Sequence, residues 1–238
     1  RQAVGIFRCV EEAVIPQHPR NADRDLAPRR YLASQAPRRA LLLEQAGVLF
    51  TPMSPGIDDG QLKMGSVSAR QWVLCLAHLK AHAGLFALQR SSDHPRDLTG
   101  PVAVIGADTI VVHRDRVIGK PSDQDHARSI INALVDDVHE VVTGVAVAHS
   151  VPRQTRWLLD RATVSMGAIA RKSIDHYLEQ GMWKGKAGAY NLSERIKAGW
   201  PITFSGDPGT IMGLPMRKLQ PWIQTWTGPL SKPTQRSD

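Results

Sequence analysis

The sequence predicts an α/β protein that contains a partly parallel sheet. Short apolar runs typical of buried strands alternate along the chain with segments whose apolar residues recur at helical spacing, and this alternation favours strands connected through helices. The composition is that of an ordinary globular protein, with 42% hydrophobic and 22% charged residues among 238. No apolar run approaches the roughly 18 residues that a membrane helix needs, so we expect no membrane partner.

The first part of the chain is predicted to contain two helices between short strands. A strand is expected at 31–34 and is followed by a helix that begins at Pro37 and ends before Gly47. Proline suits the first helical turn and glycine suits the position after the last turn. The segment 48–60 is expected to be a strand that runs into a loop. Apolar residues in 68–88 recur at steps of three and four, which predicts a long helix.

The second part is predicted to open on a hairpin. The apolar run 102–112 predicts a buried strand, and Arg114 and Asp115 stand where its turn is expected. The segment 122–134 has one apolar face and predicts a helix with Ser122 as its N-cap. The other predicted elements are strands at 139–150 and 156–169, a helix at 173–181 and a last helix that opens at Pro215.

We expect one main domain between two extensions. Residues 1–30 are rich in Pro, Arg and Asp without periodicity and predict an N-terminal extension, 31–222 predict the domain, and 223–238 predict a flexible C-terminal tail. The two cysteines, Cys9 and Cys75, do not make a disulfide scaffold, which favours a reducing, cytoplasmic location. Cys75 lies in an apolar run and is expected to be buried.

The formal net charge is +8, and such a surplus favours an anionic partner, such as a nucleotide, a nucleic acid or a membrane surface. Aromatic residues make up only 5% of the chain and are not interleaved with Lys and Arg. Single-strand binding usually combines a basic groove with stacking rings, so the composition disfavours a nucleic-acid partner.

A strand-to-helix turn at the start of the predicted domain carries the first candidate site. Arg38 and Arg39 occupy the first helical turn, where cations oppose the helix dipole and anions are favoured. Free backbone N–H groups, two guanidinium groups and the Ser34 hydroxyl together suit a phosphate. The alternative is that both arginines are simply solvated.

The second candidate is a carboxylate within the buried strand. Asp108 follows the small residues Gly106 and Ala107, and α/β folds place ligands near strand ends; the alternative is a turn aspartate. Lys120, in Gly-Lys-Pro after the predicted hairpin, could project towards the same end. Paired acids in "IDDG" include Asp59, and such pairs ligate hard cations when a further carboxylate joins them.

The order of these motifs resembles that of the Maf family of nucleoside triphosphate pyrophosphatases, also called septum formation proteins. The blocks that carry the resemblance are "LASQAPRRALLLEQAG", "IDDG", "LAHLKAHA", "IGADTIVV", "GKPSDQDHA", "HEVVTGVAV", "KAGAY" and "MGLP". They run in this order from about Tyr31 to about Trp222. The resemblance implies a long, twisted mixed sheet flanked by helices, in two lobes around a cleft, like the inosine triphosphate pyrophosphatases. It also implies a homodimer.

The resemblance assigns roles to residues of this chain. Ser34, Arg38 and Arg39 match the phosphate-binding turn of the family. Asp108 matches the acid that binds a divalent metal and activates water. The remaining matches are Lys80 and Lys120 for two phosphate-contacting lysines, and Asp59 for a second metal ligand. Mg²⁺ or Mn²⁺ is the implied cofactor.

Three positions depart from the family pattern. Ala36 replaces a serine of the turn, which removes a helix N-cap worth about 1 kcal/mol. Asp59 is one methylene shorter than the usual glutamate. Ser193 takes the place of a glutamine that helps members of the dTTP/UTP branch to recognise the base. Glu194 is the next residue, and the branch that acts on methylated guanosine triphosphate has a glutamate near this point. We therefore expect Ser193 and Glu194 to contact the substrate.

The resemblance implies metal-dependent hydrolysis of nucleoside triphosphates to a monophosphate and pyrophosphate. The expected substrates are pyrimidine nucleotides such as dTTP and UTP, or modified nucleotides, in a house-cleaning role for the nucleotide pool. Because of the three departures, the alternative is a catalytically degenerate Maf-like protein that binds nucleotide without turnover.

Overall fold

The computed structural model describes residues 29–58, 62–90, 101–151 and 153–224. Asp59, nearly all of the predicted N-terminal extension and most of the predicted tail lie outside these residues. The elements are β1 (Arg29–Ala33), α2 (Pro37–Gln45), β2 (Thr51–Met53), α3 (Ala69–Arg90), β3 (Val102–His113), β4 (Arg116–Ile118), α4 (Gln124–Leu134), β5 (Asp137–His149), β6 (Gln154–Met166), α5 (Arg171–Glu179), η3 (Ala187–Ala189), α6 (Leu192–Lys197), β7 (Ile202–Ser205), α7 (Pro208–Met212) and α8 (Met216–Gln224).

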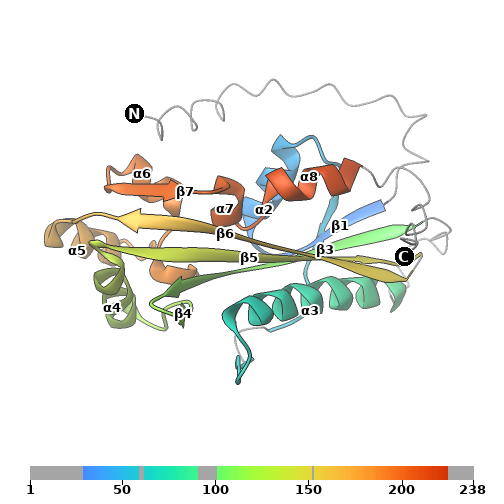
Figure 1. Cartoon of the computed structure of the whole chain (residues 1–238), viewed down its shortest axis with the longest axis horizontal. Coiled ribbons are helices and arrows are strands. Elements are labelled where there is room, and N and C mark those ends of the chain that lie inside the picture. Colours follow the sequence, from blue (N-terminus) through green and yellow to red (C-terminus); the bar gives the residue numbers. More distant parts are fainter. Residues whose placement is uncertain (1–28, 59–61, 91–100, 152, 225–238) are drawn as a thin grey trace, which may run out of the picture.

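A seven-stranded mixed sheet forms the centre of the molecule (Figure 1). Its order is β2-β1-β3-β5-β6-β7, and β4 pairs with β3. The pairs β1–β2 and β1–β3 are parallel, whereas β3–β5, β5–β6 and β6–β7 are antiparallel. The long strands β3, β5 and β6 run through the whole length of the sheet in Figure 1. The predicted α/β class with a long, mixed sheet is therefore confirmed.

The hairpin between β3 and β4 follows the sequence prediction closely. β3 pairs antiparallel with β4, and the turn residues Arg114 and Asp115 have φ values of 48° and 62°. Two successive positive φ values are the conformation that fits the twist of a two-residue hairpin. This hairpin returns the chain towards Lys120.

Helices cover the two faces of the sheet at one end (Figure 1). Alternate residues of β5 face opposite sides, as the pleat requires. Val145 and Val147 belong to the apolar cluster that includes Leu43 of α2 and Leu219 of α8. Ala146 of β5 packs instead with alanines of α3. The small residues on this second face let α3 lie close to the strands.

Glycine makes that close approach possible at one point of β3. A Cβ atom added at Gly106 would lie 2.3 Å from the backbone oxygen of Ala77 and 2.4 Å from the backbone nitrogen of Ala81. Contacts below 3.0 Å essentially do not occur at real Cβ atoms. Gly106 therefore sets the distance between β3 and α3, the two elements that carry Asp108 and Lys80.

The other end of the sheet carries a second apolar cluster. It joins α4, α5, η3, α6 and β7, and its largest fully buried side chain is Tyr177. Tyr177 Oη donates to the backbone oxygen of Ala189 at 2.8 Å, which ties α5 to the end of η3. These elements form what we call the second lobe, at the end of the sheet opposite α8 in Figure 1.

Two local predictions were wrong. The N-cap of α4 is Asp123, whose carboxylate accepts from the His126 N–H, and Ser122 lies one residue outside it. Cys75 is exposed because α3 covers the sheet with one face only, and an apolar sequence run on a helix necessarily turns some members outwards. No helix within the described ranges is long and apolar enough to span a lipid bilayer.

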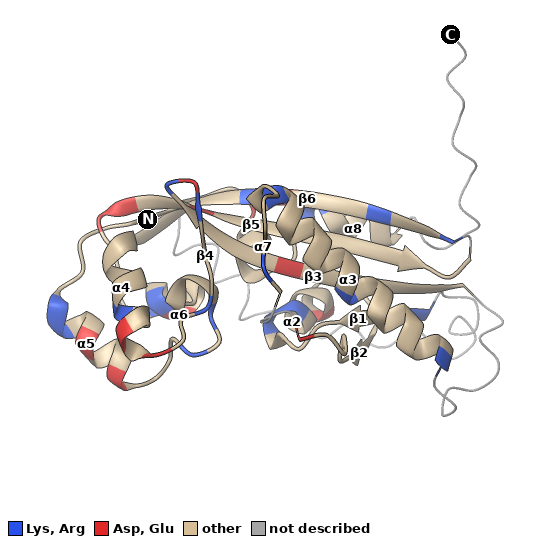
Figure 2. Cartoon of the chain, turned by 90° about the horizontal axis from the view of Figure 1, so that it is seen from below, with Lys and Arg blue, Asp and Glu red and all other residues tan. Residues whose placement is uncertain are grey.

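Basic residues are spread over the described part of the chain in one view of the molecule. Figure 2 shows Lys and Arg on several helices and loops of both lobes, with Asp and Glu among them. The positive surplus is therefore dispersed over the side of the molecule seen in that view.

Candidate active site

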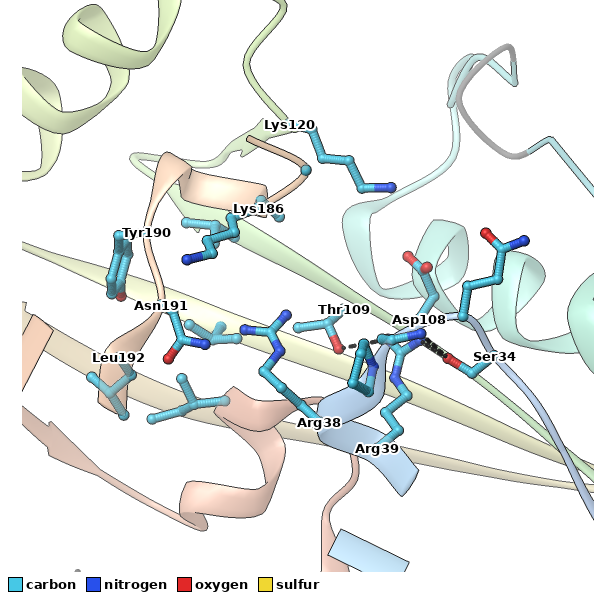
Figure 3. Close-up of a pocket in the computed structure, with 18 of the residues that line it drawn as sticks. Ser34, Arg38, Arg39, Asp108, Thr109, Lys120, Lys186, Tyr190, Asn191 and Leu192 are labelled. Carbon is cyan, nitrogen blue, oxygen red and sulfur yellow. Dashed lines mark hydrogen bonds between the residues drawn. The ribbon is translucent and has the colours of Figure 1, made fainter. Parts of the chain in front are cut away.

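A cavity of about 570 Å³ lies where the two lobes meet. Its walls come from the start of α2, from β3, from the segment after β4, and from η3 and α6. Segments far apart in the sequence thus contribute to one space, as Figure 3 shows. The walls are polar and cationic towards Asp108 and partly apolar towards Tyr190.

Arg39 is buried and joins three segments at the floor of the cavity. Its Nε donates to the Gly213 backbone oxygen at 3.0 Å, one terminal nitrogen donates to Ser34 Oγ at 3.0 Å, and the other donates to Thr109 Oγ1 at 3.2 Å. A planar guanidinium with fixed donors suits such a three-way contact, which the point charge of a lysine does not reproduce. Arg39 therefore holds α2, β3 and the loop after α7 in register around the cavity.

The N-terminus of α2 has no side-chain cap. Ala36 occupies the N-cap position, so the predicted loss of a capping hydroxyl is confirmed. The Ser34 hydroxyl accepts from the Ala36 N–H at 3.2 Å, a bond that lies before the first helical turn and does not cap it. Pro37 has no N–H and the Arg39 N–H donates to the Ala36 oxygen at 3.1 Å, so among the described residues the Arg38 N–H of this first turn is left for an anion.

Arg38 extends into the middle of the cavity, between Asn191 and Thr109 in Figure 3. Burial lowers the pKa of Arg38, and the nearby Glu194 carboxylate opposes that shift. A guanidinium nevertheless stays charged in proteins. Arg38 thus places a desolvated positive charge where a ligand would lie.

Asp108 and Lys80 form a buried ion pair at the edge of the cavity. Lys80 Nζ lies 2.6 Å from Asp108 Oδ1, and the two side chains are only 9% and 12% exposed. Both residues line the cavity, and Lys120 lines it from the segment after β4. Figure 3 shows Lys120 reaching towards the space above Asp108 and Thr109. One carboxylate therefore faces several cationic groups.

The opposite end of the cavity carries a second ion pair. Lys186 Nζ lies 2.5 Å from Glu194 Oε2, and both side chains line the cavity. Tyr190 Oη and His139 Nε2 are hydrogen-bonded at 2.6 Å. Burial raises the pKa of the Tyr190 hydroxyl and lowers the pKa of His139 to about 4, so both groups are neutral near pH 7.

Most of the predicted site residues line this one cavity: Ser34, Arg38, Arg39, Lys80, Asp108, Lys120 and Glu194. Ser193 is not among the lining residues, and its hydroxyl donates to Asn191 Oδ1 at 2.9 Å. Asp59 lies outside the described residues. The described ranges hold no group of three or more His, Cys, Asp or Glu side chains placed to bind a metal.

Sequence reasoning assigned no site role to several polar lining residues, among them Thr109, Lys186, Tyr190 and Asn191. Thr109 belongs to the "GADT" block, and Lys186 and Tyr190 belong to "KAGAY", so a signal for these three existed in the family resemblance. For Asn191 the signal was weaker, because an Asn that precedes a short helix is usually interpreted as its N-cap.

Comparison with known proteins agrees with this architecture. The family model described as "Maf-like protein" matches residues 29–226. A dTTP/UTP pyrophosphatase from Shewanella denitrificans is 36% identical over 190 residues, which cover 78% of this chain and 89% of that protein. The dTTP/UTP pyrophosphatase of Salmonella typhimurium is 37% identical over 186 residues, or 78% and 87% of the two chains. The chain therefore belongs to the Maf family.

Proposed function

We propose that this protein hydrolyses nucleoside triphosphates to a nucleoside monophosphate and pyrophosphate, with dTTP and UTP as the first candidates. The observation that carries the proposal is one cavity in which the Asp108 carboxylate and its Lys80 partner face Arg38 and Lys120. The names of the relatives, dTTP/UTP pyrophosphatase, support the substrate class. A house-cleaning role for the nucleotide pool, a cytoplasmic location and a homodimer are parts of the same proposal.

The basic residues suit a triphosphate. Phosphoanhydride cleavage depends mainly on positioning and on neutralising the charge that develops on the transferred and leaving groups. Arg38, the uncapped start of α2 and Lys120 bring positive charge to one region of the cavity. Arg39 holds this arrangement through the hydrogen bonds described above. In the proposed site these groups hold the phosphate chain and stabilise the departing pyrophosphate.

The carboxylate suits the activation of water. Lys80 binds Asp108 Oδ1, and no hydrogen bond from the described residues occupies Oδ2. In the proposed reaction Asp108 accepts a proton from the water that attacks the α-phosphorus. The bond to the β-phosphate bridging oxygen breaks, and that oxygen leaves as part of pyrophosphate.

A divalent cation also fits the donor set. Mg²⁺ commonly binds to one or two carboxylates together with substrate phosphates and retained waters, so Asp108 does not need a preformed cluster of acids. Asp108 would hold the ion, with Asp59 as the proposed second carboxylate. The ion would supply charge neutralisation and lower the pKa of a bound water.

The competing hypothesis of a degenerate binder rests on the sequence departures at Ala36, Asp59 and Ser193. A nucleic-acid partner gains no support from Figure 2, where the Lys and Arg positions are spread along the ribbon of both lobes. A binder without turnover and an enzyme would share the same cavity. The two hypotheses therefore differ in whether the bound nucleotide is converted to products.

Product analysis tests the proposal. The full chain is incubated with dTTP, UTP, dCTP, CTP and purine triphosphates with Mg²⁺ or Mn²⁺, and products are separated by ion-exchange chromatography. The proposal predicts monophosphate and pyrophosphate in equal amounts, and none when metal is chelated. Nucleotide binding by calorimetry without any turnover would instead establish the degenerate binder, and release of orthophosphate would contradict cleavage at the α-phosphorus.

A further inference from the structure

We propose that Asn191 selects the nucleobase, by donating a hydrogen bond from its side-chain amide to the carbonyl oxygen at C4 of a uracil or thymine ring. This inference rests on the proposed function for the identity of the ligand as a nucleotide. It assigns base selection to a residue that the sequence interpretation passed over in favour of Ser193.

The orientation of the Asn191 amide is determined by its hydrogen bonds. Asn191 is the N-cap of α6, and its Oδ1 accepts from the backbone N–H of Glu194 at 3.3 Å and from the Ser193 hydroxyl at 2.9 Å. A backbone N–H can be accepted only by the oxygen of the amide, so the nitrogen must lie on the other side. Asn191 can therefore present only a donor to the cavity.

That donor is directed into the cavity. Asn191 lines the cavity and is 7% exposed, and no hydrogen bond joins its Nδ2 to the described residues. In Figure 3 the Asn191 nitrogen lies on the side of Arg38 and its oxygen lies on the far side. A donor that is held in place inside a largely buried wall selects ligands that carry an acceptor at that point.

The surroundings of Asn191 suit a flat ring better than a phosphate chain. Six of the apolar lining residues belong to the buried cluster of the second lobe or pack against it: Val111, Val141, Ala187, Tyr190, Leu192 and Ile211. Arg38 lies between Asn191 and Asp108 in Figure 3. With phosphates beside Arg38 and Asp108, the base extends towards Asn191, and the edge farthest from the phosphates meets the amide.

Uracil and cytosine differ at that edge. Uracil carries an oxygen at C4, which accepts from Nδ2, whereas cytosine carries an amino group, so that two donors would face each other. A buried donor left without an acceptor costs far more than a hydrogen bond gains. We expect this mismatch to weaken CTP binding about tenfold relative to UTP, equivalent to about 1.4 kcal/mol.

The test compares affinities for UTP and CTP by calorimetry of the full chain in the presence of a metal chelator. Asn191→Ser keeps an N-cap oxygen but removes the amide NH2 group that extends towards the base, so the UTP preference should fall to within about twofold. Asn191→Asp also keeps the cap but offers an acceptor, so the ratio should reverse towards CTP. The added negative charge lies near the phosphates and weakens the binding of both nucleotides. The readout is therefore the direction in which the ratio of UTP to CTP affinity changes.

Asn132→Ser is the matched control, because Asn132 is exposed on α4 and does not line the cavity. It should keep the wild-type ratio. An unchanged ratio in both Asn191 variants, or a wild-type protein without UTP preference, would overturn the inference. The ratio is measured without turnover, so failure of hydrolysis would count against the proposed function alone.

Discussion

Gly106→Ala tests whether the close approach of α3 to β3 determines both stability and the geometry of the Lys80–Asp108 pair. The new Cβ would lie 2.3 Å and 2.4 Å from backbone atoms of Ala77 and Ala81, whereas ordinary contacts are 3.4–4 Å. The shortfall is therefore about 1 Å. Both contacts are to backbone, so no side-chain rotation can relieve them and α3 must move away from the sheet.

Overpacking of this kind typically costs 1–3 kcal/mol, and a rigid backbone neighbour places Gly106→Ala near about 3 kcal/mol. For a domain of this size that corresponds to a fall in Tm of about 6–12 °C. The same movement carries Lys80 away from Asp108, whose atoms are now 2.6 Å apart. A displacement of about 1 Å near reacting groups can cost about a hundredfold in kcat/KM.

The assay is thermal melting by circular dichroism together with kcat/KM for UTP. Gly119→Ala is the control for stability, because no atom lies within 4 Å of its added Cβ and its φ is not positive. Its Tm should stay close to that of the wild type. A Gly106→Ala protein with wild-type Tm and activity would refute the argument that this contact sets the α3 position.

Three further predictions follow from individual contacts. Arg39→Lys keeps the charge but loses the three-way hydrogen bonding, so we expect kcat/KM to fall about a hundredfold; wild-type kinetics would mean that charge alone suffices. Ala36→Ser supplies the missing N-cap of α2 and should stabilise the protein by about 1 kcal/mol in urea unfolding, and no gain would contradict the assignment of Ala36 as an uncapped helix start. The pKa of buried His139 is lowered from 6.5 to about 4, so as the pH falls the unfolded chain binds a proton at this residue before the folded protein does. Stability should therefore fall by up to about 3 kcal/mol as pH drops from 6.5 to 4, and His139→Gln should lose less over that interval; an equal loss would contradict the assignment.

The sequence was informative about the fold because strands and helices differ in their apolar period. The run at 102–112, the hairpin turn at Arg114 and Asp115, and the helix opened by Pro37 were all predicted from local chemistry. The solvent exposure of Cys75 was not predicted, since an apolar run does not by itself reveal which face of a helix packs against the sheet. The Asp123 cap differed by one position from the prediction because Ser122 and Asp123 are both good capping residues.

The site was predictable only through the order of its motifs. Taken singly, Asp108 had an alternative interpretation as a turn residue, and Arg38 and Arg39 had one as solvated side chains. Their common cavity is what favours a site. The position of Ser193 in the sequence suggested a base contact, but its hydroxyl is directed to the Asn191 oxygen. A one-dimensional pattern assigns a residue to a loop, whereas the direction of its side chain depends on the cap that the following helix forms.

The most direct test of the central claim is pyrophosphate release from UTP by Asp108→Asn, compared with Asp115→Asn. Asp115 lies on the same hairpin, exposed and with φ of 62°, a conformation that Asn tolerates. Loss of a proton-accepting carboxylate should lower kcat by about 10²–10⁴-fold in an Asp108→Asn protein that circular dichroism shows to be folded, whereas Asp115→Asn should match the wild type. A folded Asp108→Asn protein that releases pyrophosphate at the wild-type rate would contradict the assignment of this cavity as the catalytic site.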